Sequence, residues 1–173
     1  VFLRPLGLRL GMECNMEIIK GGVTAAKGFC AAGLNAGIKN NEKKDMAMVY
    51  SEKPCVTAGT FTTNKVFAAP VKWDKDIVAN SPFAQAVVVN SGVANACTGK
   101  EGDDACAAEA KAVSEALQVP ESAVLVASTG VIGAQLPMDK ICAGIKELPK
   151  KLGSSLEHGT LAACALERFC CSL

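Results

Sequence analysis

The sequence has few aromatic residues and no excess of charge of either sign. Aromatic side chains make up 5% of its 173 residues, with one tryptophan and one tyrosine, and 18 basic residues nearly balance 17 acidic ones. A nucleic-acid-binding surface is normally basic, and a surface for single strands also stacks bases on aromatic rings. We therefore expect no nucleic acid among the partners of this protein.

A long apolar run and a signal peptide are also absent. The first ten residues are partly apolar, but they contain two arginines, are too short to span a bilayer and lack a cleavage pattern. We expect no membrane association. Since the chain begins with Val1 and has methionines at 12 and 16, residues 1–15 are expected to be a non-native or disordered extension before the true start.

The cysteines and the histidine lack the spacing of a metal site. Nine cysteines are scattered without a CxxC pair, and His158 is the one histidine, so the sequence predicts no metal. Cys30 and Cys106 lie among alanine and glycine, where cysteine packs as a small apolar residue, and we interpret them as reduced thiols of a cytosolic protein. His158 has no recognisable serine or cysteine partner and is interpreted as a surface residue.

What the sequence does contain is the composition of a globular domain. Half of the residues are hydrophobic and 20% are charged, and no repeat or linker divides the chain. Short apolar or β-branched runs at 29–38, 46–50 and 56–63, with a polar turn at 40–45, predict a β meander. The first half is therefore expected to form one sheet.

The second half alternates strands and helices. Apolar runs at 84–90 and 123–127 predict buried strands, and residues 101–119 between them predict a helix with Ala105, Ala108, Ala112 and Ala116 on its buried face. A further helix is expected from residue 137, with Ile141, Ile145 and Leu148 on one side, and another at 156–165. The sequence thus predicts one α+β unit with layered α/β character.

Each buried strand of the second half ends in a polar, glycine-containing turn. Ser-Thr-Gly at 128–130 exposes backbone N–H groups and a hydroxyl, and glycine permits close approach, so this turn could hold an anion or remain an ordinary turn. Polar groups at 90–92 and 62–64 could brace a site or simply satisfy turn contacts. A nucleotide site around Gly130 and Gly133 has little support, since no GxGxxG or GxxxxGK[ST] is present.

Four blocks together resemble one family, the ornithine acetyltransferases, which are bifunctional glutamate N-acetyltransferases of arginine biosynthesis. They are Gly-Gly-Val-Thr-Ala-Ala-Lys-Gly-Phe at 21–29, Ala-Gly-Thr-Phe-Thr-Thr-Asn-Lys-Val-Phe-Ala-Ala-Pro-Val at 58–71, Val-Val-Asn-Ser-Gly-Val-Ala-Asn-Ala-Cys-Thr-Gly at 88–99, and Val-Leu-Val-Ala-Ser-Thr-Gly-Val-Ile-Gly at 124–133 with Leu-Pro-Met-Asp-Lys-Ile at 136–141. Four blocks in the family's order and spacing make the resemblance specific.

The resemblance implies an α/β/β/α sandwich shared with self-processing aminopeptidases, and a precursor that cuts itself into two chains. The residue after the cut is a threonine, which acts as the nucleophile when acetyl passes from N-acetylornithine to glutamate; some members also accept acetyl-coenzyme A. By resemblance, Thr129 and Gly130 form the oxyanion hole. It also implies no metal and no resident cofactor, and a cytoplasmic heterotetramer with two copies of each processed chain.

The sequence departs from the family at three places. Ala26 stands where the family usually has proline, and Val93 where it usually has asparagine. After Ala165 we find neither Ile-Met-Thr-Thr-Asp, nor the substrate-contacting threonine and lysine that follow it, nor the Ala-Thr-Met-Leu cut site. The substrate-binding residues and the nucleophile are therefore unassigned in this chain.

We accordingly expect residues 16–165 to be the N-terminal, α-chain part of the acetyltransferase domain, and 166–173 to be a divergent tail. A shifted reading frame or a truncated gene model is the most economical explanation; a diverged, non-catalytic relative is the alternative. The chain alone is expected to be inactive and poorly soluble, with exposed sheet edges and apolar surface. The alternative function is a binding or assembly module for acetylated amino acids.

Overall fold

The structure is a computed structural model that describes residues 21–39, 41–81 and 83–166. The expectations for residues 1–15 and for most of the 166–173 tail lie outside the described residues. Among the described helices, none has a stretch long and apolar enough to cross a membrane.

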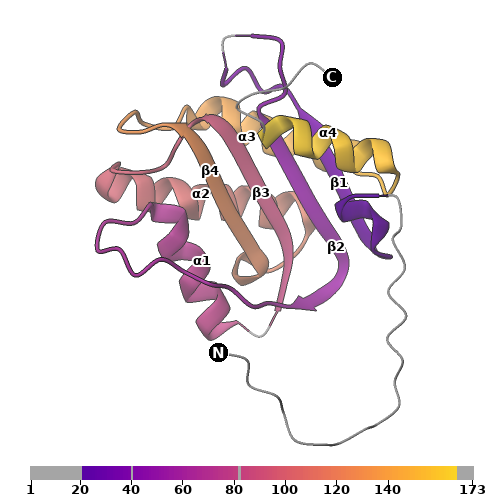
Figure 1. The fold of residues 1–173 in the computed structure, drawn as a ribbon, viewed down its shortest axis with the longest axis horizontal. Helices are drawn as coiled ribbons and strands as arrows, with labels where there is room; N and C mark the ends of the chain where they lie inside the picture. The colour runs from indigo at the N-terminus through magenta and orange to yellow at the C-terminus, as the bar shows by residue number, and fades with distance from the viewer. Residues whose placement is uncertain (1–20, 40, 82, 167–173) are drawn as a thin grey trace, which may run out of the picture.

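Four strands form a single sheet in the described part of the chain. They are β1 (Phe29–Leu34), β2 (Met46–Val56), β3 (Phe83–Val93) and β4 (Val124–Val131), hydrogen-bonded in that order (Figure 1). The first three are antiparallel neighbours, whereas β3 and β4 are parallel. The mixed α+β class is thus confirmed, as are the first two strands of the predicted meander; a parallel pair, β3 and β4, completes the sheet.

The meander's third strand, predicted at 56–63, is wrong. Only Val56 of that range lies in β2, and residues 57–64 form no strand. The place beside β2 is taken by the later and more apolar β3, so the β-branched run at 56–63 has no partner left to pair with. It connects β2 to a helix that was not predicted, α1 (Ala69–Asn80).

Helix α1 escaped prediction because its apolar pattern is weak. Only Pro70 and Ile77 are buried in it, and four of its other ten positions are charged. The usable signal was Pro70, since proline is favoured in the first turn of a helix, where its missing N–H is no loss.

The other helices are α2 (Gly99–Leu117), α3 (Met138–Glu147) and α4 (Leu156–Leu166), with short 3-10 turns η1 (Val23–Ala25), η2 (Glu121–Ala123) and η3 (Pro149–Lys151). The buried face of α2 is not the predicted alanine stripe. Ala105 is buried, but Ala108 is exposed and Ala112 and Ala116 are half-buried. The buried face is instead rotated around the helix. The residues buried with Ala105 are Gly102, Cys106, Glu109, Ala110 and Val113. In α3, the predicted contacts of Ile141 and Ile145 are confirmed.

The helices cover the two faces of the sheet unequally. Helices α2 and α3 lie on one face, here called the α2 face, and enclose the main core with Met46, Met48 and Val126. Helix α4 lies on the opposite face, the α4 face, over β1 and β2 (Figure 1). There Ala162 and Ala165 pack on the sheet, and the helix predicted at 156–165 is confirmed. The second sheet implied by the resemblance is not among the described residues.

Candidate active site

Thr129 and Gly130 lie at the carboxyl end of β4, beside the carboxyl end of β3. The parallel register pairs Thr129 with Ser91 and Gly130 with Gly92. Thr129 is exposed, Gly130 is half-buried, and Ser91 is 3% exposed. The structure therefore brings together two of the glycine segments that the sequence singled out, 90–92 and 128–130. The prediction that they form turns is wrong, because β3 continues to Val93 and β4 to Val131, so both segments are paired strand.

The two glycines allow their strands to approach closely. Gly130 has φ +145° and Gly92 has φ +113°, a region that side chains rarely adopt. A β-carbon built on Gly130 would lie 2.2 Å from the carbonyl carbon and 2.3 Å from the carbonyl oxygen of Gly92. Any other residue at 130 would push β3 and β4 apart at this pair.

Helix α1 covers part of the free edge of β4. The indole Nε1 of Trp73 donates to the carbonyl oxygen of Val124 at 2.9 Å, and the carboxylate of Asp74 accepts the N–H of Val126 at 2.9 Å. At the opposite edge, Ala31 of β1 exchanges two backbone hydrogen bonds with Gly153. The expectation of open sheet edges is therefore wrong at these positions, although exposed apolar side chains remain, including Val56 at 82% and Ile132 at 66%.

The edge contacts also indicate where the backbone of Gly130 points. Along a strand, successive residues direct their N–H and C=O groups to alternate sides. Since Val124 and Val126 face α1, the alternation directs the N–H of Gly130 to the same outer side of the sheet. The N–H of Gly130 and the hydroxyl of the adjacent Thr129 are thus two donors at one exposed strand end.

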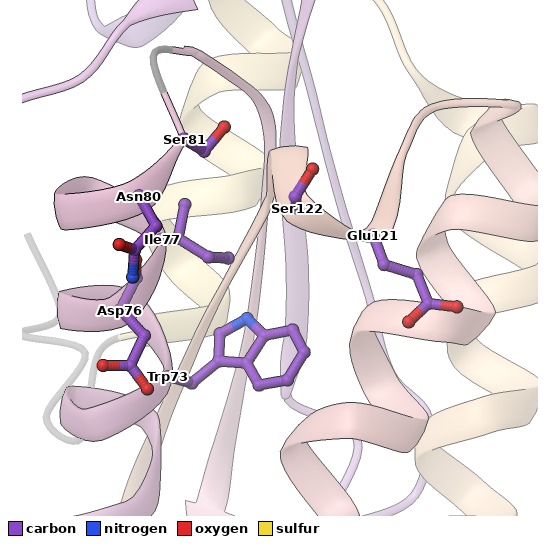
Figure 2. Close-up of a pocket in the computed structure, with 7 residues that line it drawn as sticks. All are labelled: Trp73, Asp76, Ile77, Asn80, Ser81, Glu121 and Ser122. Carbon is purple, nitrogen blue, oxygen red and sulfur yellow. The ribbon is translucent and has the colours of Figure 1, made fainter.

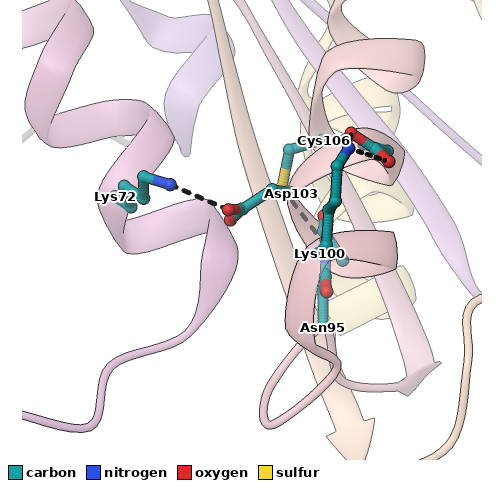
Figure 3. Close-up of polar contacts among 7 residues, drawn as sticks. Lys72, Asn95, Lys100, Asp103 and Cys106 are labelled. Carbon is teal, nitrogen blue, oxygen red and sulfur yellow. Dashed lines mark hydrogen bonds and ion pairs between the residues drawn. The ribbon is translucent and has the colours of Figure 1, made fainter.

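Burial raises the pKa of Asp74 to about 6, and the hydrogen bond from Val126 acts in the opposite direction. This carboxylate stabilises the edge of β4 rather than serving a reacting group. Its neighbour Lys72 forms an ion pair of 2.8 Å with Asp103, which joins α1 to α2 (Figure 3). Both pair members are about half exposed, so the pair adds little to stability.

The loop between β3 and α2 is held by one buried amide. The side-chain nitrogen of Asn95 donates to the carbonyl oxygen of Gly102 at 2.9 Å and to the sulfur of Cys106 at 3.2 Å (Figure 3). Its oxygen accepts the Thr98 hydroxyl at 2.6 Å. Burial raises the pKa of Cys106 to about 12, so the thiol is neutral and unreactive. The first turn of α2 is fixed at this end of the sheet.

Next to Ser91 of β3, Asp45 anchors the loop between β1 and β2. Its carboxylate accepts backbone N–H groups from Ala36, Ile38 and Lys39 at 2.6, 2.6 and 3.0 Å, and its carbonyl accepts the N–H of Ser91 at 2.8 Å. Asp45 was not predicted. An acidic residue followed at once by an apolar run was the only available signal, and it does not distinguish a buried anchor from a turn residue.

The remaining sequence candidates form local contacts. Asn90 donates to the carbonyl oxygen of Val93 at 2.9 Å. Thr62 and Asn64 accept backbone N–H groups two residues further along, in an exposed loop. His158 is half-buried in α4, and Ser155 lies 2.6 Å from its Nδ1. That serine also accepts the backbone N–H of His158, so the pair caps the helix and is no catalytic dyad.

Of the cavities near the parallel strands, two lie at opposite ends of them. One of about 510 Å³ is lined by Trp73, Ile77 and Glu121 (Figure 2). It lies beside η2, where β4 begins, at the opposite end of the strand from Thr129. A second, of about 240 Å³, opens where β3 ends and is lined by Phe67, Cys97 and Thr98, among others. The second cavity lies at the end of the sheet where Gly92 and Gly130 pair.

No three histidine, cysteine, aspartate or glutamate side chains in the described part of the chain are placed to hold a metal ion. The donors at this end of the sheet are instead a hydroxyl and backbone N–H groups. Such donors stabilise negative charge that develops on a carbonyl oxygen. The arrangement can therefore serve acyl transfer.

The fold has close counterparts among solved structures. The arginine biosynthesis bifunctional protein ArgJ of Bacillus halodurans superposes with a TM-score of 0.81 at 41% sequence identity, covering 86% of this chain and 78% of that one. An ornithine acetyltransferase of Mycobacterium tuberculosis, solved in complex with ornithine, gives 0.82 at 42% identity, covering 86% and 81%. This chain is therefore an α+β protein of the ornithine acetyltransferase class.

The chain also matches a family model over most of its length. The ArgJ family model matches residues 30–167, and the chain belongs to the ArgJ family. It is 47% identical over 149 residues to the bifunctional ArgJ protein of Gloeobacter violaceus and 48% identical over 150 residues to that of Caldanaerobacter subterraneus. These matches cover 86% and 84% of this chain but 36% and 37% of the relatives, so the chain spans about a third of their length.

Proposed function

We propose that this chain is the N-terminal, α-chain part of an enzyme that transfers acetyl from N-acetylornithine to glutamate. The observation that carries the proposal is the end of β4 at Thr129 and Gly130, whose two donors lie at an exposed strand end held against Gly92. The ornithine bound to the Mycobacterium tuberculosis relative, which is 42% identical, supports the substrate class.

In this proposal the nucleophile is the N-terminal threonine of a second chain. Its free amino group, with a pKa near 8, takes the proton of the hydroxyl as the oxygen attacks the acetyl carbonyl. The amide bond breaks, ornithine leaves with the proton, and an acetyl-threonine ester remains. The amine of glutamate then attacks this ester, takes the acetyl group and restores the threonine.

Thr129 and Gly130 act in both steps of the proposed reaction. Each step places negative charge on the acetyl oxygen, and the Thr129 hydroxyl and the Gly130 N–H donate hydrogen bonds to it. Preorganised donors are effective because they need no reorientation as the charge forms, and the loss of one typically costs about 10²–10³ in rate. No resident cofactor takes part; acetyl-coenzyme A would be a second acetyl donor in a bifunctional enzyme.

The proposal includes assembly with the second chain as a cytoplasmic heterotetramer. The uncovered part of the α4 face, where Val87 and Leu125 are half-buried, supports a large apolar partner surface. Since the sequence contains no Ala-Thr-Met-Leu, residues 1–173 alone are expected to transfer no acetyl group.

A chimaera tests the proposal. Residues 21–166 of this chain would replace the matching segment of the Mycobacterium tuberculosis ornithine acetyltransferase, and acetyl transfer from N-acetylornithine to glutamate would be measured. We expect Thr129→Ala to lower kcat by about 10²–10³, Thr129→Ser to retain most activity, and Thr62→Ala, in an exposed loop, to have no effect.

A chimaera that is folded and active but insensitive to Thr129→Ala would contradict the oxyanion role. A separate measurement addresses the alternative of a binding module. If N-acetylornithine raises the Tm of the unmodified 173-residue chain, this segment binds the substrate without its partner, and the non-catalytic alternative gains support.

A further inference from the structure

A cavity of about 520 Å³ lies where α3 meets the connected ends of β1 and β2. Its lining includes Leu34, the last residue of β1, and Lys44, which precedes β2 by two residues. The volume falls within the range of about 300–1,000 Å³ that is usual for small-molecule sites. None of the residues that line this cavity takes part in the proposed reaction.

The close approach of α3 to the sheet explains the hollow. Gly144 of α3 is buried, and a β-carbon built on it would lie 2.5 Å from the sulfur of Met46 and 3.1 Å from the β-carbon of Ala36. The helix therefore packs on the end of the sheet without a side chain between them. The apolar part of the cavity lining is formed by small residues and one leucine, namely Leu34, Ala36, Ala143 and Gly144.

Three lysine side chains line the same cavity, and two of them are held in place by backbone. The ammonium of Lys44 donates to the carbonyl oxygen of Gly33 at 3.2 Å, and that of Lys140 to the carbonyl oxygen of Gly37 at 2.5 Å. The ammonium of Lys151 has no acceptor among the described residues. Since an ammonium has three donors, all three lysines keep donors for a ligand.

The carboxylate among the lining residues is already neutralised. Glu147 forms an ion pair of 2.6 Å with Lys150, which does not line the cavity. The hydrogen bond from Lys150 and its positive charge lower the pKa of Glu147. The other three charged residues of the lining are the lysines, so the cavity has an excess of positive charge. A cleft lined by charge of one sign concentrates small ions of the opposite sign.

The kind of cation indicates the kind of anion. The lining contains no arginine, whose planar fork selects carboxylates through two parallel hydrogen bonds. Lysine is a compact point charge and a common phosphate binder, and several lysines around one hollow suit a group with several negative charges.

We propose that this cavity binds a small ligand with a diphosphate group, which lies among the ammonium groups of Lys44, Lys140 and Lys151. The proposal does not depend on the proposed function, because binding is measured directly and without acetyl transfer. The diphosphate is either inorganic or part of an organic molecule that also contacts the apolar lining.

Calorimetric titration of the 173-residue chain with inorganic pyrophosphate tests the site. We expect one pyrophosphate per chain and a Kd below about 1 mM, which is the weak end of specific binding. The double variant Lys140→Gln with Lys151→Gln should raise Kd at least tenfold, because it removes two charge-assisted contacts. The matched control is Lys111→Gln with Lys146→Gln, which loses the same charge at exposed positions outside the cavity and should change Kd less than twofold.

Glu147→Gln provides a change in the opposite direction. It removes the carboxylate from the cavity, leaves the lysines in place and should lower Kd by about two- to fivefold. A structural disturbance would instead raise Kd. Weaker binding in this variant would therefore place the pyrophosphate elsewhere and overturn the proposal.

Three further outcomes would also overturn it. They are no binding at 1 mM pyrophosphate, equal weakening in the two double variants, and binding of citrate, a tricarboxylate, as tightly as pyrophosphate. Titration with adenosine diphosphate then separates the two sources of the diphosphate. Binding at least as tight as that of pyrophosphate, with the same dependence on Lys140 and Lys151, would support an organic diphosphate, and binding more than tenfold weaker would support the inorganic ion.

Discussion

Gly130 faces Gly92 across the parallel strands so closely that a β-carbon on Gly130 would lie 2.5 Å from the next backbone nitrogen, that of Val93. The contact is between two backbones, so no side chain can move aside to relieve it. The same contact sets the position of the Thr129 and Gly130 donors. Packing and the proposed chemistry therefore depend on the same glycine.

Gly130→Ala should lower the free energy of unfolding by about 2–4 kcal/mol, because it combines an unfavourable φ with overlap against β3. Gly133→Ala is the matched control: Gly133 also has a positive φ, +84°, but a β-carbon there meets nothing within 4 Å. We expect the control to cost about 1 kcal/mol. Urea unfolding of both variants measures the difference, and equal losses would show that the close approach is relaxed in solution.

Asp74 should matter for its acceptor oxygen rather than for its charge. Asp74→Ala leaves the N–H of Val126 without an acceptor and should cost about 1–3 kcal/mol of unfolding free energy. Asp74→Asn keeps an acceptor and removes a carboxylate whose pKa burial raises to about 6, so its stability at pH 7 should equal or exceed that of the wild type.

Asp76→Ala, an exposed carboxylate two residues further along α1, is the control for Asp74 and should change stability by less than about 0.5 kcal/mol. Thermal melts at pH 7 compare the three variants. If Asp74→Asn is as unstable as Asp74→Ala, the negative charge itself is required, and the edge contact is not the explanation.

The strands and helices that the sequence revealed are those with strong apolar patterns. The apolar run at 84–90 predicts a buried strand. The spacing of Ile141, Ile145 and Leu148 predicts one face of a helix. Both elements are found in the structure. Helix α1 lacks such a pattern because it covers a strand edge through Trp73 and Asp74, whose polar groups bond to backbone. Edge covering leaves no periodic signal, so residue patterns alone do not reveal it.

The candidate site was predictable only in part, for a similar reason. Glycine at 92 and at 130 predicts two turns, but the sequence does not show that both lie in strands and touch. That contact follows from the parallel register of β3 and β4. The register depends on how α2, the helix that connects the two strands in sequence, packs on the sheet. The contacts of Asp45 had only the weak signal of an acidic residue before an apolar run, and those of Ser91 with distant backbone had none.

The cysteines should differ sharply in reactivity. Cys97 and Cys164 are exposed, whereas burial raises the pKa of Cys106 to about 12, leaving about one thiol in 10⁴ ionised at pH 8. Under native conditions, iodoacetamide should label Cys97 and Cys164 first and Cys106 only when the chain unfolds. Mass spectrometry of labelled peptides gives the rates, and early labelling of Cys106 would mean that α2 opens.

Glu109 of α2 is fully buried, and neither of its carboxyl oxygens has a hydrogen-bond partner among the described residues. Burial raises its pKa from 4.5 to about 8. Between pH 4.5 and about 8, Glu109 is therefore protonated in the folded protein but ionised in the unfolded chain. Unfolding then releases a proton, so the stability from this group is fully present below pH 4.5 and is lost as the pH rises to 8.

Glu109→Gln keeps the size of the side chain and removes the titration. At about 1.36 kcal/mol per pKa unit, the wild type should lose about 3–5 kcal/mol from this group between pH 4.5 and 8, and the variant should lose none of it. Glu115→Gln, exposed on the same helix, should follow the wild type. Urea unfolding at pH 5, 6.5 and 8 gives the slopes. Parallel slopes for Glu109→Gln and the wild type would mean that water or a partner group reaches Glu109 in solution. A flatter slope for Glu109→Gln would show that α2, which links the two strands of the candidate site, packs on the sheet through a protonated acid.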